Sequence, residues 1–442
     1  MANINIKKTK TIIFLFLFSF TILLLPKISL ATNWYVDGNL TVDCTSNNYS
    51  ITNRNCTGSD SSAYNTIQEA VNLATAAGDI IYVRNGTYTG TISMKASGST
   101  NNYITLQGYN NETVTIQPGS ANIGINLAGY DWLKIANFVI NGGQTGIRYM
   151  PGGTADVSEH IIIANNTIQN QVTVNEPQGG IAARPHYWEI YGNTFSGISG
   201  GNGREMIFYE SRKAGIDSKC ELNIHDNIFD NHSAQDNIHL GGCINVVIED
   251  NIFNSGSGGT GHDDAIALEC TMNIIINHNI FNNAQNFDID AQTCPSGRNL
   301  NNTVITNNVF ISVNGIAMLI KDGSYNIYGN TFYSGSMSAI KTEERFTPGS
   351  SIGIIKNNIF YGNSGYNNIY NSGAQTINYN IYYNNGTSVQ NGDIGVNSIS
   401  VNPQFQSIAD FNGADIGAYE YLAVNLPLDT TSPSAPTGLM VQ

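Results

Sequence analysis

One short pattern occurs nine times in the sequence and limits the possible folds more than any other feature. Each copy has an apolar residue, two variable residues, an asparagine, one further residue and then an aromatic or aliphatic residue, as in "IIINHNIF". The steps between successive asparagines are 27, 34, 24, 28, 29, 22, 28 and 22 residues. They are Asn166, Asn193, Asn227, Asn251, Asn279, Asn308, Asn330, Asn358 and Asn380. A period of this size is typical of a solenoid, in which each repeat forms one coil.

The residue types of the repeat favour β-strands over helices. The repeats are rich in β-branched and aromatic residues, are interrupted by glycine, and lack the spaced leucines of leucine-rich repeats. Each asparagine turn is followed by a second short strand with alternating apolar residues, as in "DNIHL", "DAIAL" and "GIAML". We therefore predict an all-β solenoid of parallel strands, in which neighbouring coils stack about 4.8 Å apart.

The recurring asparagine is predicted to belong to the scaffold. Stacked in register at an inward-turning corner, each side-chain amide can bond the amide of the next coil and nearby backbone groups. The aromatic or aliphatic residue two positions later, such as Phe281 after Asn279, is expected to form a second internal column. Such columns fix the strand register, because a slip of one residue would turn the apolar side chains outward.

The first 31 residues have the features of a secretory signal peptide. A basic start with Lys7, Lys8 and Lys10 precedes a short apolar run, and the small residues Ser29 and Ala31 follow it. The apolar run is short for a membrane anchor, although an uncleaved anchor is the alternative. We predict a secreted or cell-surface protein of the bacterial type, monomeric and without a membrane segment after cleavage.

Net charge excludes some classes of partner. The formal net charge is −14 at pH 7, and removal of residues 1–31 would make it −18. Such a surface repels nucleic acid and anionic lipid, because phosphate binding requires clustered lysine and arginine. A strongly anionic polymer would need cations to bridge it to this surface.

An N-terminal helix is predicted to cover the open end of the first coil, as solenoids require. The helix lies in "AYNTIQEAVNLATAAGDIIYV", where Asn65 and Gln68 stand at the spacing of a capping box. Its apolar face comprises Ile67, Ala70, Val71 and Ala74.

Together with "ITLQGYNNETVTIQPGSANIGINLAGYDWLKIANFVINGG", this opening resembles exported right-handed parallel β-helix proteins of the pectate-lyase-like superfamily. It is most similar to polysaccharide lyases acting on pectate, alginate or chondroitin, and to surface proteins with the same opening. "DFNGADIGAYEY", from Asp410, is similar to the sequence that closes many bacterial surface β-helices. The resemblance implies a right-handed parallel β-helix domain over residues 32–422. Residues 423–442 resemble a linker and the truncated start of a fibronectin type III module.

The resemblance also implies a chemistry. Lyases of this superfamily remove a sugar-ring proton with a lysine or arginine, often with Ca²⁺ neutralising the uronate. An enzyme of this kind would act on a polysaccharide by β-elimination, and its candidate bases are Lys213, Arg212, Lys321 and Lys341. "QDNIHL" and "HDDAIAL" also resemble the acidic motifs of polygalacturonases, which makes a glycoside hydrolase the second alternative. That family has a histidine-containing coil where "NFDIDA" stands in this chain.

Alternation within the second strands predicts an acidic outer face. Apolar residues such as Ile238 and Ile266 point inward, which turns the residues between them outward. The acidic and histidine residues expected on this face are Asp236, His239, Asp263, Asp264, Glu269, Asp288 and Asp290. Three interpretations stay open: a solvated acidic surface, an acid/base pair, or a Ca²⁺ site. The Ca²⁺ ligands would be Asp263, Asp264, Glu269, Asp288 and Asp290.

The longest repeat carries an insertion with an unusual density of charge. It reads "SGISGGNGREMIFYESRKAGIDSKCE" and includes Glu210 beside Arg212 and Lys213. A long loop on a regular solenoid is a usual place for a binding groove, although an ion-paired surface loop is the alternative. The substrate-binding candidates on and near this loop are Arg184, His186, Trp188, His239 and Glu210.

The six cysteines fall into two groups. Cys44 and Cys56 flank a polar loop before the N-terminal helix, and we expect them to pair. The other four are separated by 23, 27 and 24 residues, so they should stack at one turn of successive coils, where the coil spacing suits a disulfide. Export favours oxidation, and we predict Cys220–Cys243 and Cys270–Cys294. A Cys243–Cys270 pairing and a zinc site are the alternatives.

Two functional hypotheses follow. The first is an exported β-helix protein that binds and, as an enzyme, cleaves an extracellular polysaccharide. The second is a non-catalytic surface protein whose solenoid is an adhesive surface or a stiff spacer. The fibronectin-like end favours the second, since such modules are commonly strung along surface proteins.

Overall fold

The computed structural model describes residues 31–403 of the 442-residue chain, apart from short internal gaps. The gaps are 121, 150–157, 174–178, 184, 201–204, 211–219, 231–235, 255–263, 283–286, 293–301, 345–350, 366, 372–373, 391–393 and 396. Residues 1–30 of the predicted signal peptide, and the predicted closing motif and fibronectin-like end, lie outside the described residues. In the described ranges, no helix has the length and apolarity needed to cross a membrane.

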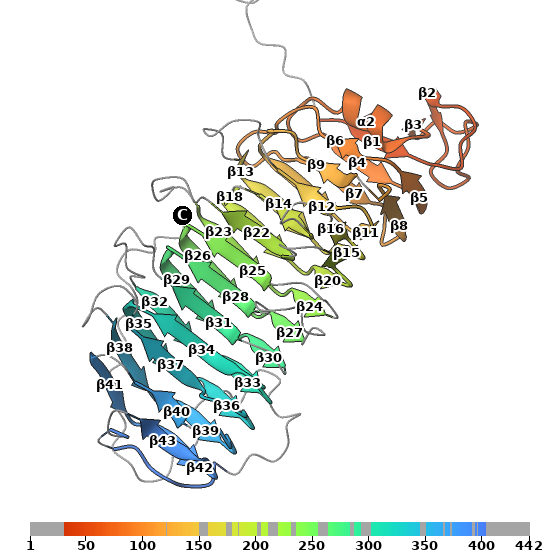
Figure 1. Ribbon diagram of the computed structural model, residues 1–442. Coiled ribbons are helices and arrows are strands. Elements are labelled where there is room, and N and C mark those ends of the chain that lie inside the picture. Colours follow the sequence, from red (N-terminus) through yellow and green to blue (C-terminus); the bar gives the residue numbers. More distant parts are fainter. Residues whose placement is uncertain are drawn as a thin grey trace, which may run out of the picture.

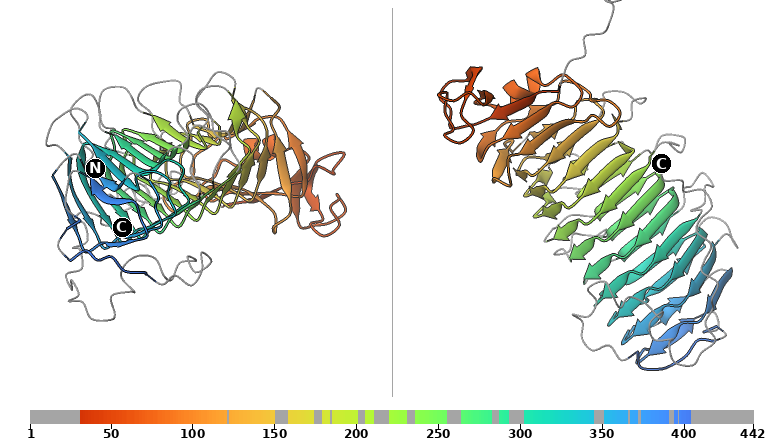
Figure 2. Two further views of the ribbon diagram at one scale, coloured as in Figure 1. Left: turned by 60° about the horizontal axis from the view of Figure 1, so that its bottom comes forward. Right: turned by 180° about the vertical axis from the view of Figure 1, so that it is seen from behind.

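The chain winds into a parallel β-helix whose coils stack along one axis (Figures 1 and 2). Each coil adds one strand to each of three long sheets, which are named sheets 1, 2 and 3. The predicted all-β, right-handed parallel β-helix is therefore confirmed. The prediction of two strands per coil is wrong, because the aromatic residue after each repeated asparagine lies in a third, very short strand.

Sheet 1 has 15 strands and sheets 2 and 3 have 12 each among the described residues, and all pairings in them are parallel except that of β2 with β3. Sheet 1 contains β1 (Asn33–Val36), β2 (Cys44–Tyr49), β3 (Ser61–Tyr64), β4 (Ile80–Val83), β7 (Ile104–Gly108), β10 (Leu133–Ala136), β14 (Ile161–Ala164), β19 (Trp188–Tyr191), β23 (Leu222–His225), β26 (Ile244–Glu249), β29 (Met272–Asn277), β32 (Thr303–Thr306), β35 (Gly323–Tyr328), β38 (Ser351–Lys356) and β41 (Ala374–Asn378). Sheet 2 contains β5 (Gly86–Thr89), β8 (Val114–Gln117), β11 (Val139–Asn141), β15 (Thr167–Gln169), β20 (Thr194–Ser196), β24 (Ile228–Asp230), β27 (Ile252–Asn254), β30 (Ile280–Asn282), β33 (Val309–Ile311), β36 (Thr331–Tyr333), β39 (Ile359–Tyr361) and β42 (Ile381–Tyr383).

Sheet 3 contains β6 (Ile92–Ser93), β9 (Ile123–Asn126), β12 (Thr145–Arg148), β17 (Ile181–Ala182), β22 (Ile207–Glu210), β25 (Asp236–Gly241), β28 (Asp264–Glu269), β31 (Phe287–Gln292), β34 (Ile316–Lys321), β37 (Ile340–Glu343), β40 (Asn367–Tyr370) and β43 (Thr387–Gln390). Two further pairs link neighbouring loops: β13 (Ser158–Glu159) with β18 (Pro185–His186), and β16 (Val172–Thr173) with β21 (Ser199–Gly200).

Helix α2 (Ile67–Leu73) packs against the first strands at the N-terminal end of the β-helix, as predicted. The prediction of a capping box at Asn65 and Gln68 is wrong by one residue. The N-cap is Thr66, and Glu69 completes the box, which matches the Thr and Glu that the motif prefers. The predicted apolar face is at most 2% exposed and comprises Ile67, Ala70, Val71 and Ala74.

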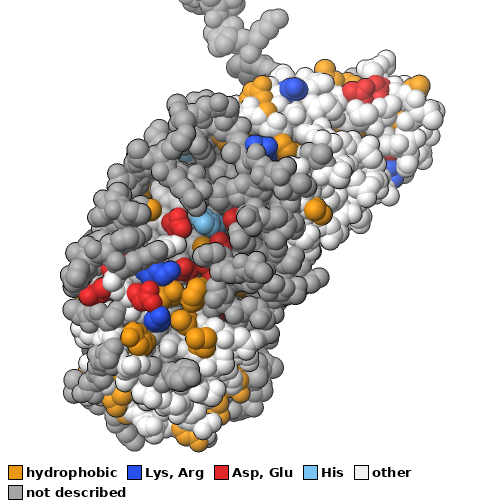
Figure 3. Space-filling model, viewed as in Figure 1, with side chains coloured by type: hydrophobic (Ala, Val, Ile, Leu, Met, Phe, Trp, Pro, Cys, Tyr) orange, Lys and Arg blue, Asp and Glu red, His pale blue; other side chains and the backbone are white. Residues whose placement is uncertain are grey.

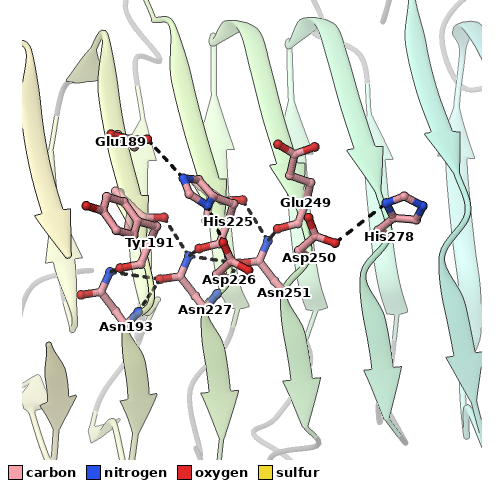
Figure 4. A network of polar contacts seen from close by, with 12 residues as sticks. Glu189, Tyr191, Asn193, His225, Asp226, Asn227, Glu249, Asp250, Asn251 and His278 are labelled. Atoms are coloured by element: carbon pink, nitrogen blue, oxygen red, sulfur yellow. Dashed lines mark hydrogen bonds and ion pairs between the residues drawn. The ribbon is translucent and has the colours of Figure 1, made fainter. Parts of the chain in front are cut away.

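The repeated asparagines form a ladder inside the β-helix, between sheets 1 and 2 (Figure 4). All nine are at most 1% exposed. The backbone N–H and Nδ2 of Asn279 donate to Asn308 Oδ1 at 2.9 and 3.0 Å, and Nδ2 also donates to the backbone oxygens of Ile248 and Asn277. Asn279 Oδ1 accepts the backbone N–H and Nδ2 of Asn251, both at 3.0 Å. The predicted ladder is confirmed, and each rung ties neighbouring coils together.

A column of aromatic rings lies beside the ladder, with one ring from each of eight strands of sheet 2. Neighbouring ring centroids are 4.6–5.0 Å apart, which is the spacing of hydrogen-bonded strands. Every ring is at most 4% exposed. The column confirms the second internal stack and comprises Phe195, Phe229, Phe253, Phe281, Phe310, Phe332, Phe360 and Tyr382.

The residue before each ladder asparagine turns the chain from sheet 1 into sheet 2. It has a left-handed backbone, as at Asp226, Asp250 and His278, each with φ of 55°. Asn, Asp and Gly adopt this conformation at low cost, which explains why they prevail at this position. These side chains form a polar row outside the ladder, in which His225 Nδ1 lies 2.8 Å from Asp226 Oδ2 (Figure 4).

The N-terminal hairpin of β2 and β3 carries the first predicted disulfide, Cys44–Cys56, with a Cα–Cα distance of 5.2 Å. An ion pair of 2.6 Å between Arg54 and Asp37 ties the loop between β2 and β3 to the end of β1. The hairpin is therefore fixed to the β-helix independently of the coil stacking.

The second group of cysteines also pairs as predicted where it is described. Cys220 and Cys243 form a disulfide with a Cα–Cα distance of 4.9 Å. They lie just before β23 and β26, so the bond joins two successive coils at the same turn. Cys270 is also disulfide-bonded, and Cys294, the partner predicted for it, lies outside the described residues.

Candidate functional site

The outer face of sheet 3 carries most of the polar residues that the sequence analysis selects. The predicted alternation is confirmed, because Ile238, Ile266 and Ile289 are fully buried and in register. The residues between them form outward columns. One column is His239, Ala267, Asp290, Leu319, Lys341 and Tyr370. Another is Gly241, Glu269, Gln292, Lys321 and Glu343.

Charged side chains gather on this face. Only 12% of the residues in the chain are charged, yet acidic, basic and histidine side chains lie together over the middle coils (Figure 3). The rest of the described surface in this view is mostly uncharged. A local concentration of charge in a charge-poor protein marks this face as the candidate site.

Glu205, Asp236 and His239 form the one group of potential metal ligands among the described residues. One ligand atom from each lies within 4.8 Å of the others, and His239 Nδ1 is 2.9 Å from Asp236 Oδ2. Burial of His239 disfavours the charged form of its imidazole and so lowers its pKa. The hydrogen bond and charge of Asp236, with the charges of Glu205 and Glu269, outweigh burial and raise the pKa of His239 above its ordinary value. The surroundings of His239 therefore favour its protonated form.

Lysine side chains from two successive strands each contact a carboxylate. Lys321 Nζ donates to Asp290 Oδ2 at 2.9 Å, and the two side chains are 13% and 5% exposed. Lys341 Nζ lies 2.6 Å from Glu343 Oε1 and 5.7 Å from the ring centroid of Tyr370. Each lysine side chain thus lies beside a carboxylate.

Asp288 differs from every other acidic residue of this face. It is 1% exposed, and neither carboxyl oxygen has a hydrogen-bond partner in the described part of the chain. Burial raises the pKa of Asp288 well above its ordinary value. Its register neighbours are Ala265 and Ala317, so no polar group of the adjacent strands offers a partner.

The interpretation of the face as a solvated acidic surface is therefore wrong for its described aspartates. Asp236, Asp264, Asp288 and Asp290 are each at most 4% exposed. Asp288 and Asp290 lie on the outer side of the sheet and are enclosed there, whereas Asp236 and Asp264 stand two residues before the inward Ile238 and Ile266. Alternation determines the side of the sheet on which a residue lies, and it carries no information about what covers that side.

Replacing Asp288 with alanine should stabilise the protein by about 1–3 kcal/mol, because an unpaired buried polar group is removed. The effect should depend on pH. The folded pKa lies above the unfolded one, so below the ordinary pKa of aspartate only the cost of the unpaired neutral group remains, and the additional cost of keeping Asp288 protonated in the folded state is absent. The cost grows as the pH rises toward the folded pKa and is complete above it. Chemical denaturation of both proteins across this pH range measures the difference. A variant that is less stable at neutral pH would contradict the expectation.

Several predicted site residues lie away from sheet 3 or outside the residues that the structure describes. Trp188 is 2% exposed and packs edge-on against Tyr149 in the core, so its assignment to substrate binding is corrected. Its position at the start of β19 is an inward one, in register with Leu222. His186 is 3.1 Å from Glu159 Oε1, in a cluster with aromatic rings. Arg184, Arg212, Lys213 and Asp263 lie outside the described residues, and of Glu210 only the backbone is described.

The predicted Ca²⁺ ligands do not form a metal-binding group among the described residues, and Ca²⁺ binding stays a prediction. The sequence analysis missed Glu205 as a ligand although a periodic signal was present. Glu205, Asp236 and Asp264 each stand two residues before an inward isoleucine on successive strands. Strands in register place such residues in one column.

No protein-family model matches the sequence, and no curated protein sequence matches it. Solved structures resemble the fold. A complex of the alginate lyase AlyF-OU02 with G6 has a TM-score of 0.53 at 11% identity, and the match covers 86% of this chain and 90% of that one. The PL6 family alginate lyase AlyGC has a TM-score of 0.50 at 14% identity, with 76% of this chain and 52% of that one covered. At such identities the likeness shows the fold alone, a parallel β-helix.

Proposed function

We propose that this protein is exported and binds an extracellular polysaccharide along the outer face of sheet 3, between β25 and β37. The observation that carries the proposal is the gathering of hydrogen-bonding and charged side chains on this one face. Polysaccharides are recognised through many hydroxyl and, in some polymers, carboxylate groups, which pair with such side chains. The similar solved structures are alginate lyases, which favours a polysaccharide over other extended ligands.

Cleavage by β-elimination is the enzymatic form of this proposal. It needs a base for the sugar-ring proton and a positive charge near the uronate carboxylate. Lys321 and Lys341 are the described candidates for the base, and Arg212 and Lys213 remain candidates outside the described residues. A cation held by Glu205, Asp236 and His239 would supply the positive charge.

One observation favours a second candidate function, polysaccharide binding without elimination. Lys321 and Lys341 each contact a carboxylate at 2.9 Å or less, so each is already engaged in an ion pair rather than free to accept a proton. Placed in this way, the two lysines would bind an anionic or hydroxyl group of a polymer without removing a proton.

A panel of neutral and uronate polysaccharides tests both forms of the proposal. Binding is measured by calorimetry, and elimination by the ultraviolet absorbance of the unsaturated product. We expect Lys321→Gln to weaken binding about tenfold or more, which corresponds to the loss of one charge-assisted hydrogen bond. Asp250→Asn, which changes a charge near the turn between sheets 1 and 2, is the matched control. No binding to any polymer of the panel would refute the proposed function.

Divalent cations should stabilise the folded protein through the Glu205, Asp236 and His239 group. Two carboxylates with an imidazole suit Mn²⁺ or Zn²⁺ as well as Ca²⁺, so all three are tested. At a hundredfold excess over Kd, the gain in the free energy of unfolding is about 2.7 kcal/mol. Calorimetric titration and thermal unfolding with and without chelator measure it. His239→Gln should abolish the gain, and an unchanged melting temperature with every cation would reject the metal site.

A further inference from the structure

A row of aromatic and polar side chains runs along the outside of the β-helix, where the chain passes from sheet 3 into sheet 1 (Figure 1). Each member stands immediately before the first inward residue of a sheet 1 strand, and these strands pair in register from β7 to β32. One side chain per coil gives the row a repeat of about 4.8 Å. The row, which we name the turn column, comprises Tyr103, Trp132, His160, Tyr187, Glu221, Asn245, Asn273 and Asn302.

The first half of the turn column is a stack of rings. The ring centroids of Trp132 and His160 are 3.6 Å apart, and those of His160 and Tyr187 are 4.8 Å apart, with nearly parallel planes. Because the rings use their faces on one another, a partner meets their edges, which carry the indole N–H, an imidazole nitrogen and the phenol hydroxyl. These groups form no hydrogen bond with another described residue, and the Trp132 and His160 nitrogens are not buried. Tyr187 is 45% exposed.

The second half of the turn column is a ladder of amides. Asn273 Nδ2 donates to Asn245 Oδ1 at 3.0 Å, and Asn302 Nδ2 donates to Asn273 Oδ1 at 3.1 Å. A primary amide has two N–H donors and an oxygen with two lone pairs. Within the described residues, Asn273 therefore keeps one N–H and one lone pair for a partner after both bonds of the ladder are made.

The backbone indicates that the aromatic members have a function. Trp132, His160 and Tyr187 have φ of 54–57°, and the asparagines of the later coils have φ of 54–58°. Asparagine adopts this left-handed conformation at low cost, whereas a bulky residue in it is strained. Ring stacking offsets part of this strain. Strained residues that persist on a surface are expected where binding or activity requires them.

The repeat of the turn column selects the class of partner. An extended peptide advances by about 3.3 Å per residue. A nucleic acid strand advances by about 3.4 Å per nucleotide and carries phosphates, which a protein of net charge −14 repels. One sugar unit of an extended polysaccharide has about the length of one coil spacing, so successive units would meet equivalent groups on successive coils. Sugar hydroxyls donate and accept hydrogen bonds, as the free groups of the turn column do.

The charge of the turn column favours an uncharged sugar. Burial lowers the pKa of His160 below its ordinary value, although the carboxylates of Glu159 and Asp131 act in the opposite direction. The imidazole is therefore neutral at neutral pH. Glu221 is then the one charged member, and the turn column contains no lysine or arginine that could pair with a uronate carboxylate.

We propose that the turn column is a second glycan-binding surface, which holds one chain of a neutral, hydroxyl-rich polysaccharide along the axis of the β-helix. It goes beyond the proposed function, because it lies outside the face of sheet 3 and uses none of the residues of that face. A second copy of this protein has the same repeat. However, a stable protein interface buries about 800 Å² on each partner, which is more than a row one side chain wide offers. A single sugar chain needs only such a row.

The experiment uses the full chain and neutral cello-, xylo-, manno- and chito-oligosaccharides of increasing length, with oligo-uronates for comparison. The main variant is Asn245→Gly with Asn273→Gly, because glycine keeps the left-handed backbone while both amides are removed. Asn282→Ala is the matched control, since it removes an outer amide of sheet 2 that donates to Asn254 Oδ1 at 2.9 Å. Lys321→Gln reports on the face of sheet 3. Calorimetry measures binding, sedimentation measures self-association, and thermal unfolding verifies that each variant is folded.

We expect the affinity for a neutral oligosaccharide to rise with each added sugar unit. The double glycine variant should lower this affinity about tenfold, which corresponds to the loss of two or more neutral hydrogen bonds. Asn282→Ala and Lys321→Gln should leave it unchanged. Binding should also change the fluorescence of Trp132, and Trp132→Phe should abolish that change.

Three results would overturn the turn column as a binding surface. Binding that is lost in Lys321→Gln and kept in the double glycine variant would locate the sugar on sheet 3, and the proposed function would stand. Absence of binding to every neutral oligosaccharide would overturn the turn column and leave uronate binding as the test of the proposed function. Self-association that the double glycine variant abolishes would identify a second copy of the protein as the partner.

Discussion

Replacing Asn279 with alanine should lower the free energy of unfolding by about 3–5 kcal/mol. The side chain is fully buried in the middle of the ladder. Its loss leaves the backbone N–H of Asn251 and the carbonyl oxygen of Ile248 without these hydrogen bonds, and Asn308 Oδ1 keeps only one of its two bonds from this residue. Each buried group left unpaired costs about 1–3 kcal/mol, and the variant adds a cavity.

Two further variants make this expectation specific to the ladder. Asn380→Ala should cost less, because Asn380 is the last rung and its backbone N–H donates to Ser398 Oγ rather than to another asparagine. Asn277→Ala, two residues before Asn279 and half-buried on the outer side, should cost about 0.5 kcal/mol or less. Urea denaturation of the three variants gives the comparison. Equal costs at Asn277 and Asn279 would show that the ladder contributes no more than surface contacts.

Removing the Cys220–Cys243 disulfide should lower the free energy of unfolding by about 3 kcal/mol. The bond closes a loop with a sequence separation of 23 residues, and the entropy that such a loop removes from the unfolded chain corresponds to about this value. The double variant Cys220→Ala with Cys243→Ala avoids free thiols, and denaturant unfolding measures its stability. Strand β25 lies between the two cysteines, so this loop carries Asp236 and His239.

The same double variant tests whether the disulfide also holds the candidate site. We expect weaker binding of divalent cations, since the strand that carries Asp236 and His239 loses one restraint. Removing the Cys44–Cys56 disulfide is the control, because its loop of 12 residues lies in the N-terminal hairpin and contains no site residue. A double variant as stable as the natural protein would show that coil stacking alone fixes this part of the chain.

Features that repeat with the coil could be predicted from the sequence. The ladder asparagines, the Phe column and the Cys220–Cys243 pair all recur at one coil length, and parallel strands in register place such residues on top of one another. The third strand of each coil escaped prediction, because three residues such as Ile280–Asn282 are too few to show alternation. Their hydrogen bonds come entirely from neighbouring coils.

The candidate site could be predicted only in part. Alternation placed Asp288 and Asp290 on the outer side of sheet 3, and the structure agrees. The enclosure of Asp288 and the ion pair between Asp290 and Lys321 could not be foreseen, because both depend on contacts between distant segments. Trp188 was misassigned because a large aromatic residue serves a core and a sugar-binding surface equally well, and only its register decides between them.

Every coil adds its strands to three sheets that share one ladder. The strands of sheet 3 therefore divide its outer face into equal intervals of one strand spacing. Loops of different length leave these intervals unchanged, since steps of 22 and 34 residues between ladder asparagines both add one rung. The length of this face can therefore change only by whole coils, about 4.8 Å at a time. Insertion of one further coil between β31 and β34 would separate Asp290 from Lys321, together with the other register pairs of these two strands, while the remaining neighbour relations on the face are kept.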